Sequence, residues 1–324
     1  MPILEVRNLS VTYTTKNRRI AAVQGVSLEI EERDAVGIVG ESGSGKSTLA
    51  MAMLRLLPKN GAEVGGEVLL NGTDLLALPE DKLSKLRWKE LAVVFQKSMN
   101  SLSPVHRIGA QMADVYRLHE SSASKREAKR RIVELLEMVN LPERVYKLYP
   151  HELSGGMMQR VAIALSLMHH PRLLILDEAT TALDVVTQGQ ILEEMMELER
   201  KLGITRLMIT HDMSVVATSC NKVVVMYAGQ VVEAGLVKDV LTKPAHPYTQ
   251  GLLRSIPSFD GEKSNIRGIP GSIPALDVPL AGCAFAERCE FAADSCRTSK
   301  PQLAELPDRR QVACHLRGGE IHAQ

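Results

Sequence analysis

The chain has 324 residues, of which 45% are apolar, so it is long enough for roughly two domains with a full core. Lysine and arginine number 39 and aspartate and glutamate 38, which gives a net charge of +1, and aromatic residues make up only 3%. Nucleic-acid binders usually show a basic excess and aromatic stacking platforms, so this composition argues against that class.

The N-terminus, MPILEVRNLS, has no basic region followed by an apolar core, and no apolar stretch approaches the length of a membrane span. We therefore expect a cytosolic chain in which disulfides do not form.

Apolar and polar residues alternate in the first thirty positions, which predicts strands separated by the polar turn TTKNRR. The apolar run 35–39 predicts a short buried strand that ends at Gly40. Asn71-Gly72 marks a hairpin turn after a further strand. These signals together predict a small antiparallel sheet laid against a parallel core.

Later in the chain, apolar runs alternate with segments of helical spacing, such as 128–139 and 191–202. This alternation is typical of an α/β fold with a parallel sheet covered by helices. The composition changes near residue 244, where Pro and Gly become frequent, and we expect a separate C-terminal module there. The later buried strands are expected at 91–95, 173–176, 207–210 and 223–226.

The run Lys125–Arg131 contains five basic residues on an expected helix. Such a run is usually a solvated helix face, and the alternative is a patch that binds phosphate or lipid.

A phosphate-binding loop follows the expected strand at 35–39. GESGSGKST fits G-x-x-x-x-G-K-[ST], and it stands between a strand and a helix as the mechanism requires. The glycines let backbone N–H groups turn toward phosphate oxygens, and the helix presents its N-terminus to the anion. Lys46 would bridge the β- and γ-phosphates of a nucleoside triphosphate, and Ser47 would ligate Mg²⁺. The loop comprises Gly40, Glu41, Ser42, Gly43, Ser44, Gly45, Lys46, Ser47 and Thr48.

Two adjacent carboxylates end the buried strand of LLILDE. Asp177 is expected to hold Mg²⁺, directly or through water, and Glu178 to act as the general base for the attacking water. The alternative is that one of the two acids only caps the next helix.

Three further side chains have weaker individual signals. His211, after a strand in ITHD, could hydrogen-bond the γ-phosphate, although a histidine at a strand end is often structural. Gln96, after the strand 91–95, could sense Mg²⁺ and the γ-phosphate. The ring of Tyr13 could stack on adenine, or be an ordinary strand aromatic.

The octapeptide LSGGMMQR, residues 153–160, follows the phosphate loop by about a hundred residues. This combination, with the Gln, the paired acids, TALD and ITHD in the same order, resembles the ATP-binding cassette (ABC) family over residues 3 to about 240. The resemblance implies an ABC-type P-loop NTPase with a RecA-like core, an antiparallel β subdomain and a helical subdomain at about 97–155. It also implies that Ser154 begins a helix.

In this family the signature residues act across a dimer. The resemblance therefore implies that Ser154, Gly155 and Gly156 approach the γ-phosphate bound by a second ATPase subunit, and that Asp184 contacts that subunit's phosphate loop. Met158 and Ala179 depart from the commonest family residues, but neither change removes a catalytic group.

Several segments are similar to the ATPase subunits of oligopeptide, dipeptide and nickel importers: KSMNSLSP after Gln96, the DEATTALDV run, HPYTQGLL, and the tail IPGSIPALDVPLAGCAFAERC. Lys97 and Ser98 stand where Asp and Pro are common in a segment that faces the permease, which weakens the assignment of cargo. Oligosaccharide and nickel are the alternative cargoes to peptides.

Four of the five cysteines lie in the tail with spacings unlike the C-x₂-C pairs of most zinc ribbons. Four nearby thiolates suit an iron–sulfur cluster or zinc, and unligated thiols are the alternative. The resemblance favours a structural 4Fe–4S cluster over zinc. The fifth cysteine, Cys220, is expected to be a plain thiol, and His315 is not expected to be a ligand. The expected ligands are Cys283, Cys289, Cys296 and Cys314.

The sequence thus predicts an ABC nucleotide-binding domain at 1–243 and a cysteine-rich extension at 244–324. The expected activity is ATP hydrolysis coupled to solute import, with ATP, Mg²⁺ and the cluster as cofactors. The expected partners are a second ATPase, identical or related, two membrane permeases and an extracytoplasmic substrate-binding protein, but no nucleic acid. The chain would sit peripherally on the cytoplasmic face of the membrane. The rival hypothesis is a soluble ABC ATPase that acts on nucleic acid or ribosomes.

Overall fold

The structure is a computed structural model that describes residues 2–16, 18–95, 102–179, 183–255, 268–278 and 280–316. Its internal contacts divide the chain into two compact units. Unit 1 consists of Met1–Ala77 with Ile209–Gln324, and unit 2 of Leu78–Met208. The chain therefore leaves unit 1 after its first strands and returns to it for its C-terminal third.

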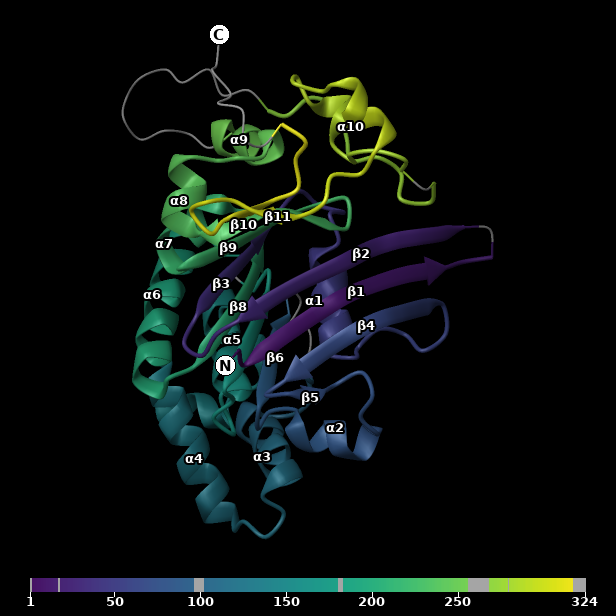
Figure 1. Cartoon of the computed structure of the whole chain (residues 1–324). Helices are drawn as coiled ribbons and strands as arrows, with labels where there is room; N and C mark the ends of the chain where they lie inside the picture. Colours follow the sequence, from purple (N-terminus) through teal and green to yellow (C-terminus); the bar gives the residue numbers. More distant parts are fainter. Residues whose placement is uncertain are drawn as a thin grey trace. The chain divides into compact units, whose positions relative to one another are not determined.

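Unit 1 contains the antiparallel sheet that the alternating N-terminal pattern predicts (Figure 1). Its strands are β1 (Leu4–Thr14), β2 (Arg19–Ile30), β4 (Ala62–Leu70) and β5 (Thr73–Asp74), in the order β2-β1-β4-β5. Every neighbouring pair is antiparallel. The hairpin at Asn71-Gly72 is confirmed, with φ values of 48° and 79° that favour these two residue types.

The second group of strands in unit 1 begins with β3 (Ala35–Val39), which pairs in parallel with β9 (Lys222–Tyr227). Strand β10 (Gln230–Leu236) is antiparallel to β9, and the short strands β12 (Gln311–Val312) and β11 (Ala304–Glu305) extend the same edge. The tail thus adds strands to the group that includes β3. Helix α1 (Lys46–Met53) follows β3, α7 (Met213–Ser219) precedes β9, and α8 (Val237–Thr242) follows β10.

The residues after 244 share a hydrophobic core with β9 and β10. Tyr248 on α9 (Pro247–Arg254) and Phe285, before η4 (Ala286–Arg288), are buried against Tyr227 of β9. Their rings lie 4.6 Å and 5.3 Å from the Tyr227 ring, centre to centre. The structure places this part of the tail in the compact unit of the phosphate loop, and the expected boundary between 243 and 244 stays an expectation.

Unit 2 combines two parallel strands with several helices. Strand β6 (Leu91–Phe95) pairs in parallel with β7 (Leu173–Asp177), and β8 (Thr205–Thr210) runs across the boundary between the units. A capping box between Ser124 and Glu127 starts α4, whose apolar positions match the expected helical spacing. The helical elements are α2 (Glu80–Leu86), α3 (Ile108–His119), α4 (Lys125–Met138), η2 (Glu143–Lys147), η3 (Pro150–Glu152), α5 (Gly155–Ser166) and α6 (Val185–Leu202).

Across the ranges given above, no helix is both long and apolar enough to cross a membrane.

A buried carboxylate joins the tail to the rest of unit 1. The Glu233 side chain on β10 is fully buried, and its oxygens accept hydrogen bonds from the backbone N–H groups of Ala245 and His246 at 2.8 and 2.9 Å. Arg310, which is 8% exposed, forms an ion pair with Glu233 at 3.5 Å and donates to the carbonyl of Lys243. One acid–base pair therefore fixes the residues on both sides of α8.

We expect Arg310→Leu to destabilise the chain by about 3–5 kcal/mol, because it leaves the buried Glu233 carboxylate without its cation. Urea unfolding measures the loss. Arg19→Leu is the matched control, since the Arg19–Glu63 pair is 66% and 63% exposed and should contribute at most about 1 kcal/mol. Equal losses in the two variants would contradict the structural role of the buried pair.

Candidate nucleotide-binding site

The phosphate loop approaches neighbouring backbone so closely that two of its positions need glycine. Gly40 and Gly45 have φ values of 153° and 99°. A Cβ on Gly40 would lie 2.2 Å from the carbonyl oxygen of Met226, and one on Gly45 would lie 2.4 Å from that of Ala22. The loop is therefore wedged between β2 and the end of β9, which explains these two glycines sterically.

Lys46 lies beneath the loop, only 5% exposed. Its ammonium group donates to the carbonyls of Gly40 and Glu41 at 2.8 and 2.9 Å, which holds the side chain along the inside of the loop. Lys46 also begins α1, and the N-cap residue Gly45 has no side chain to bond the first N–H groups of that helix. A cation beside a helix N-terminus without a side-chain cap is an arrangement that suits phosphate.

The tyrosine predicted to stack on adenine lies beside the same loop. The Tyr13 hydroxyl is 3.4 Å from the hydroxyl oxygen of Thr48, the last loop residue. The ring is half-buried on β1, where Tyr13 pairs with Ile20 of β2. The position fits the expected role, which stays a prediction.

Glu41 receives two contacts from the C-terminal third of the chain that the sequence did not predict. Its backbone N–H donates to the Tyr248 hydroxyl at 2.9 Å. Its carboxylate accepts two hydrogen bonds from Arg288, at 2.9 and 3.0 Å. Tyr248 belongs to the HPYTQGLL segment and Arg288 to the AFAERC end of the tail segment, both of which the sequence analysis used only as family markers.

Asp177 and Glu178 occupy the end of β7 in unit 2. Asp177 is 6% exposed, and Glu178 is half-buried. Glu178 has a φ of 49°, a left-handed conformation that costs a non-glycine residue about 1–2 kcal/mol. Strained backbone of this kind often occurs where a side chain must be aimed for function.

The structure describes His211 but not Gln96. His211 is exposed between β8 and α7, next to Asp212, which caps α7 through the N–H of Ser214 at 2.8 Å. Gln96, with Lys97 and Ser98, lies outside the described residues. The expected roles of both His211 and Gln96 stay predictions.

The signature serine begins a helix, as expected. Ser154 is the N-cap of α5 and accepts a hydrogen bond from the N–H of Met157 at 3.3 Å, while Gly155 and Gly156 form the first turn. Ser154 is exposed and the two glycines are partly exposed. The start of the signature helix is therefore accessible on the surface of unit 2.

Asp184 lies next to the signature. It caps α6 by accepting from the N–H and hydroxyl of Thr187 at 2.9 and 2.7 Å, and the hydrogen bond from that N–H is the first cause of the lowered pKa of Asp184. A Cβ on Gly156 would lie 3.0 Å from the Thr187 methyl group. The starts of α5 and α6 thus adjoin within one unit.

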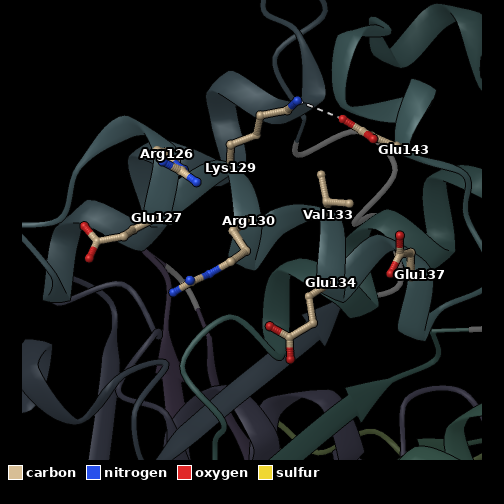
Figure 2. Close-up of a pocket in the computed structure, with 8 residues that line it drawn as sticks. All are labelled: Arg126, Glu127, Lys129, Arg130, Val133, Glu134, Glu137 and Glu143. Carbon is tan, nitrogen blue, oxygen red and sulfur yellow. Dashed lines mark ion pairs between the residues drawn. The ribbon is translucent and has the colours of Figure 1, made fainter.

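A charged hollow lies over the basic run of α4 (Figure 2). Lys129 pairs with Glu143 at 2.8 Å, and this interaction raises the pKa of Lys129. Acidic and basic side chains are mixed throughout the hollow, which supports a solvated helix face over a phosphate-binding patch. The lining residues are Arg126, Glu127, Lys129, Arg130, Val133, Glu134, Glu137 and Glu143.

None of the four tail cysteines forms a disulfide in the described part of the chain. Cys296 and Cys314 are buried, and Cys283 and Cys289 are half-buried. Burial, with smaller effects from the other three thiols, raises the pKa of Cys289 to about 11. Among the side chains that the structure describes, no three His, Cys, Asp or Glu groups are arranged to hold a metal ion. The expected cluster is therefore not supported by a preformed metal site.

Cys220 packs against the hydrophobic core of unit 1. The Nε2 of His315 donates to the carbonyl of Ser299 at 2.9 Å. Their expected lack of a ligand role stays a prediction.

We expect Gly45→Ala to abolish tight nucleotide binding, because its methyl group would push the loop away from Ala22. Equilibrium binding of a fluorescent ATP analogue measures this loss. Gly43→Ala is the control within the loop, since a Cβ there meets no atom within 4 Å and is opposed only by the φ of 83°. Comparable affinity in both variants would contradict the steric argument.

Comparisons with known proteins agree with this site. The model of the ABC transporter family matches residues 23–181, and that of the oligopeptide/dipeptide transporter C-terminal region matches 232–296. The chain is 45% identical to the probable peptide ABC transporter ATP-binding protein y4tR of Sinorhizobium fredii, covering 96% of this chain and 94% of that protein. It is also 45% identical to the oligopeptide transport ATP-binding protein OppD of Escherichia coli, covering 96% and 92%.

A solved structure shows the same fold. A bacterial ABC transporter cassette determined as a dimer superimposes with a TM-score of 0.65 and 31% identity, over 72% of this chain and 98% of that one. Its dimeric state is a property of that protein. With the phosphate loop, the signature helix and relatives that match over nearly their whole length, the chain belongs to the ABC transporter family, in the branch of oligopeptide and dipeptide ATP-binding subunits.

Proposed function

We propose that the chain is the ATP-hydrolysing subunit of a membrane importer that takes up peptides. The observation that carries this proposal is the phosphate loop. Lys46 lies inside the loop and begins a helix whose N-cap residue provides no side-chain hydrogen bond. The names of the relatives support peptides rather than oligosaccharides or nickel, and rather than an action on nucleic acid or ribosomes.

Residues of the chain would divide between two ATP molecules. Lys46, Ser47, Asp177, Glu178, His211 and Gln96 would serve the nucleotide bound by this chain, with Tyr13 against its adenine. Ser154, Gly155, Gly156 and Asp184 would serve the nucleotide of a second ATPase subunit. The exposure of Ser154 and Asp184 supports this division, because a group that acts on a partner must be accessible.

The Mg²⁺ ion that accompanies ATP would be held by oxygen ligands. The Ser47 hydroxyl is exposed in the first turn of α1, and Asp177 supplies a carboxylate at the end of β7. Hydroxyl and carboxylate oxygens are the ligands that Mg²⁺ prefers, so the donor set fits the ion. When bound, the ion neutralises charge on the phosphates.

Glu178 would accept a proton from the water that attacks the γ-phosphate. Its left-handed backbone directs the chain out of β7 at this residue, and half-burial lowers the number of competing waters around the carboxylate. His211 would hydrogen-bond the γ-phosphate and orient that water. Lys46 would bind the β- and γ-phosphates throughout, since its charge is fixed inside the loop.

The importer would comprise a second ATPase, two permeases and an extracytoplasmic binding protein that selects the peptide. In this assembly the chain would lie on the cytoplasmic face of the membrane as a peripheral subunit. Closure of the two ATPases over ATP would move the permeases, and hydrolysis would reopen the pair.

The four tail thiols would hold a structural 4Fe–4S cluster. They fit the cluster in number and type, since such clusters are held by four cysteine thiolates. Zinc is the less favoured occupant. The N–H of Cys283 donates to the carbonyl of Cys296 at 2.8 Å, which supports the proximity of these two cysteines.

We expect Glu178→Gln to lower the turnover number of the importer ATPase by about 10²–10⁴, the usual contribution of a general base. Nucleotide affinity should stay near that of the parent, because the amide preserves shape. Steady-state phosphate release and analogue binding measure the two quantities. Near-normal turnover would exclude Glu178 as the base.

We expect the importer complex, purified without oxygen, to be brown and to contain four irons per copy of this chain. Cys289→Ser should lower the iron content and bleach the absorption. Cys220→Ser is the matched control, since Cys220 lies on α7's C-terminal end and outside the proposed ligand set. Iron-free protein with stoichiometric zinc would favour zinc instead.

A further inference from the structure

Glu41 of the phosphate loop is contacted by Lys46 and by the C-terminal third of the chain. Lys46 bonds its carbonyl, and the C-terminal third bonds its N–H and its carboxylate. The N–H of Glu41 donates to the Tyr248 hydroxyl, and the carboxylate of Glu41 accepts from Arg288. The remaining group, the Glu41 carbonyl, accepts from Lys46 at 2.9 Å. The backbone and side chain of Glu41 are therefore fixed from two directions at once.

Arg288 is built into its place from several elements of unit 1. The guanidinium is 6% exposed and makes a forked pair with Glu41, whose side chain is 28% exposed. It also donates to the carbonyls of Pro270 and Ile269, at 2.7 and 3.2 Å, and to the Tyr227 hydroxyl at 3.2 Å. Such a fork fixes direction as well as distance, which a lysine ammonium group does not do.

The aromatic cluster makes this support rigid. Tyr227 and Tyr248 are fully buried with Phe285, and the Arg288 guanidinium carbon lies 5.6 Å from the Tyr227 ring centre and 5.8 Å from that of Phe285. A guanidinium that rests on buried rings and bonds two carbonyls loses little further freedom when it pairs with Glu41. The pair therefore transmits the position of the tail to the loop.

We propose that Arg288 is a positioning residue for nucleotide binding, and that through Glu41 the C-terminal segment sets the affinity of the phosphate loop for ATP. Arg288 acts by ordering the loop before the nucleotide arrives, because a preorganised loop loses less conformational entropy on binding. The proposal rests on the ATP-binding role of the loop and is independent of any metal at the cysteines.

The test compares Arg288→Gln with the parent in the purified importer complex. We expect the KM for ATP and the dissociation constant of a non-hydrolysable ATP analogue to rise about tenfold, the effect of one charge-assisted hydrogen bond. The turnover number at saturating ATP should change much less. Arg288→Lys should restore only part of the affinity, because it keeps the charge and loses the fork.

The matched control is Arg254→Gln. Arg254 pairs with Glu290 at 3.0 Å in the same segment, but both side chains are more than half exposed, and no contact joins that pair to Glu41 among the hydrogen bonds of the described residues. We expect this variant to bind nucleotide as the parent does.

Tyr248→Phe gives an independent measurement if Arg288→Gln does not assemble. It removes only the oxygen that accepts from the Glu41 N–H, so it too should weaken analogue binding. Unchanged affinity in the assembled Arg288 variants, or in Tyr248→Phe where those do not assemble, would overturn the proposal. A lowered melting temperature with unchanged affinity would also overturn it, since it would show a structural role alone. A parent complex without ATPase activity would instead refute the proposed function.

Discussion

The contact on which the nucleotide site depends is the close approach of the phosphate loop to the backbone of β2, of β9 and of the β9–β10 turn. The carbonyls of Met226 and Ala22 leave no space for a side chain at Gly40 and Gly45, respectively. The N–H of Gly229 also donates to the Ser44 carbonyl at 2.9 Å, from the same turn. The antiparallel sheet and the strand group of β3 therefore form the two walls that give the loop its shape. The position of Lys46 inside the loop follows from that shape.

The C-terminal segment contacts the phosphate loop through α9, and a buried, uncharged histidine caps that helix. Burial lowers the pKa of His246 to about 4, so its Nδ1 accepts the N–H of Tyr248 at 3.0 Å and caps α9. The capped helix then places the Tyr248 hydroxyl at Glu41. A protonated imidazole could not accept that bond. The HPY sequence thus has a physical meaning beyond its use as a family marker, since it connects the tail to the loop.

Local patterns predicted the elements well. The alternation in β1 and β2, the Asn71-Gly72 hairpin and the helical spacing of α4 each depend on neighbouring residues, and the structure has them where expected. The loop and the signature helix were predictable for the same reason, because a glycine-rich turn and a serine N-cap each depend only on residues that are close in sequence.

Long-range polar pairs were not predictable. Glu41 and Arg288 are 247 positions apart, and Glu233 and Arg310 are 77 apart. A single arginine in a polar segment has no periodicity, and its burial depends on rings and carbonyls that only the folded chain brings together. Burial of a charged residue next to its partner is a property of the fold, so a sequence pattern does not reveal which two residues pair.

The same reasoning explains how the signature can serve a partner and still stabilise its own helix. A hydroxyl has one donor and two acceptor sites, so the Ser154 oxygen can accept from Met157 while its O–H remains available to an outside oxygen. The helix that follows is fixed by a fork from Arg160 to Glu194 of α6, at 2.9 and 2.8 Å. The contact of Gly156 with Thr187 joins the starts of the same two helices. The signature helix is therefore held to α6 both at its start and by the Arg160–Glu194 fork, so the exposed Ser154 has a fixed support.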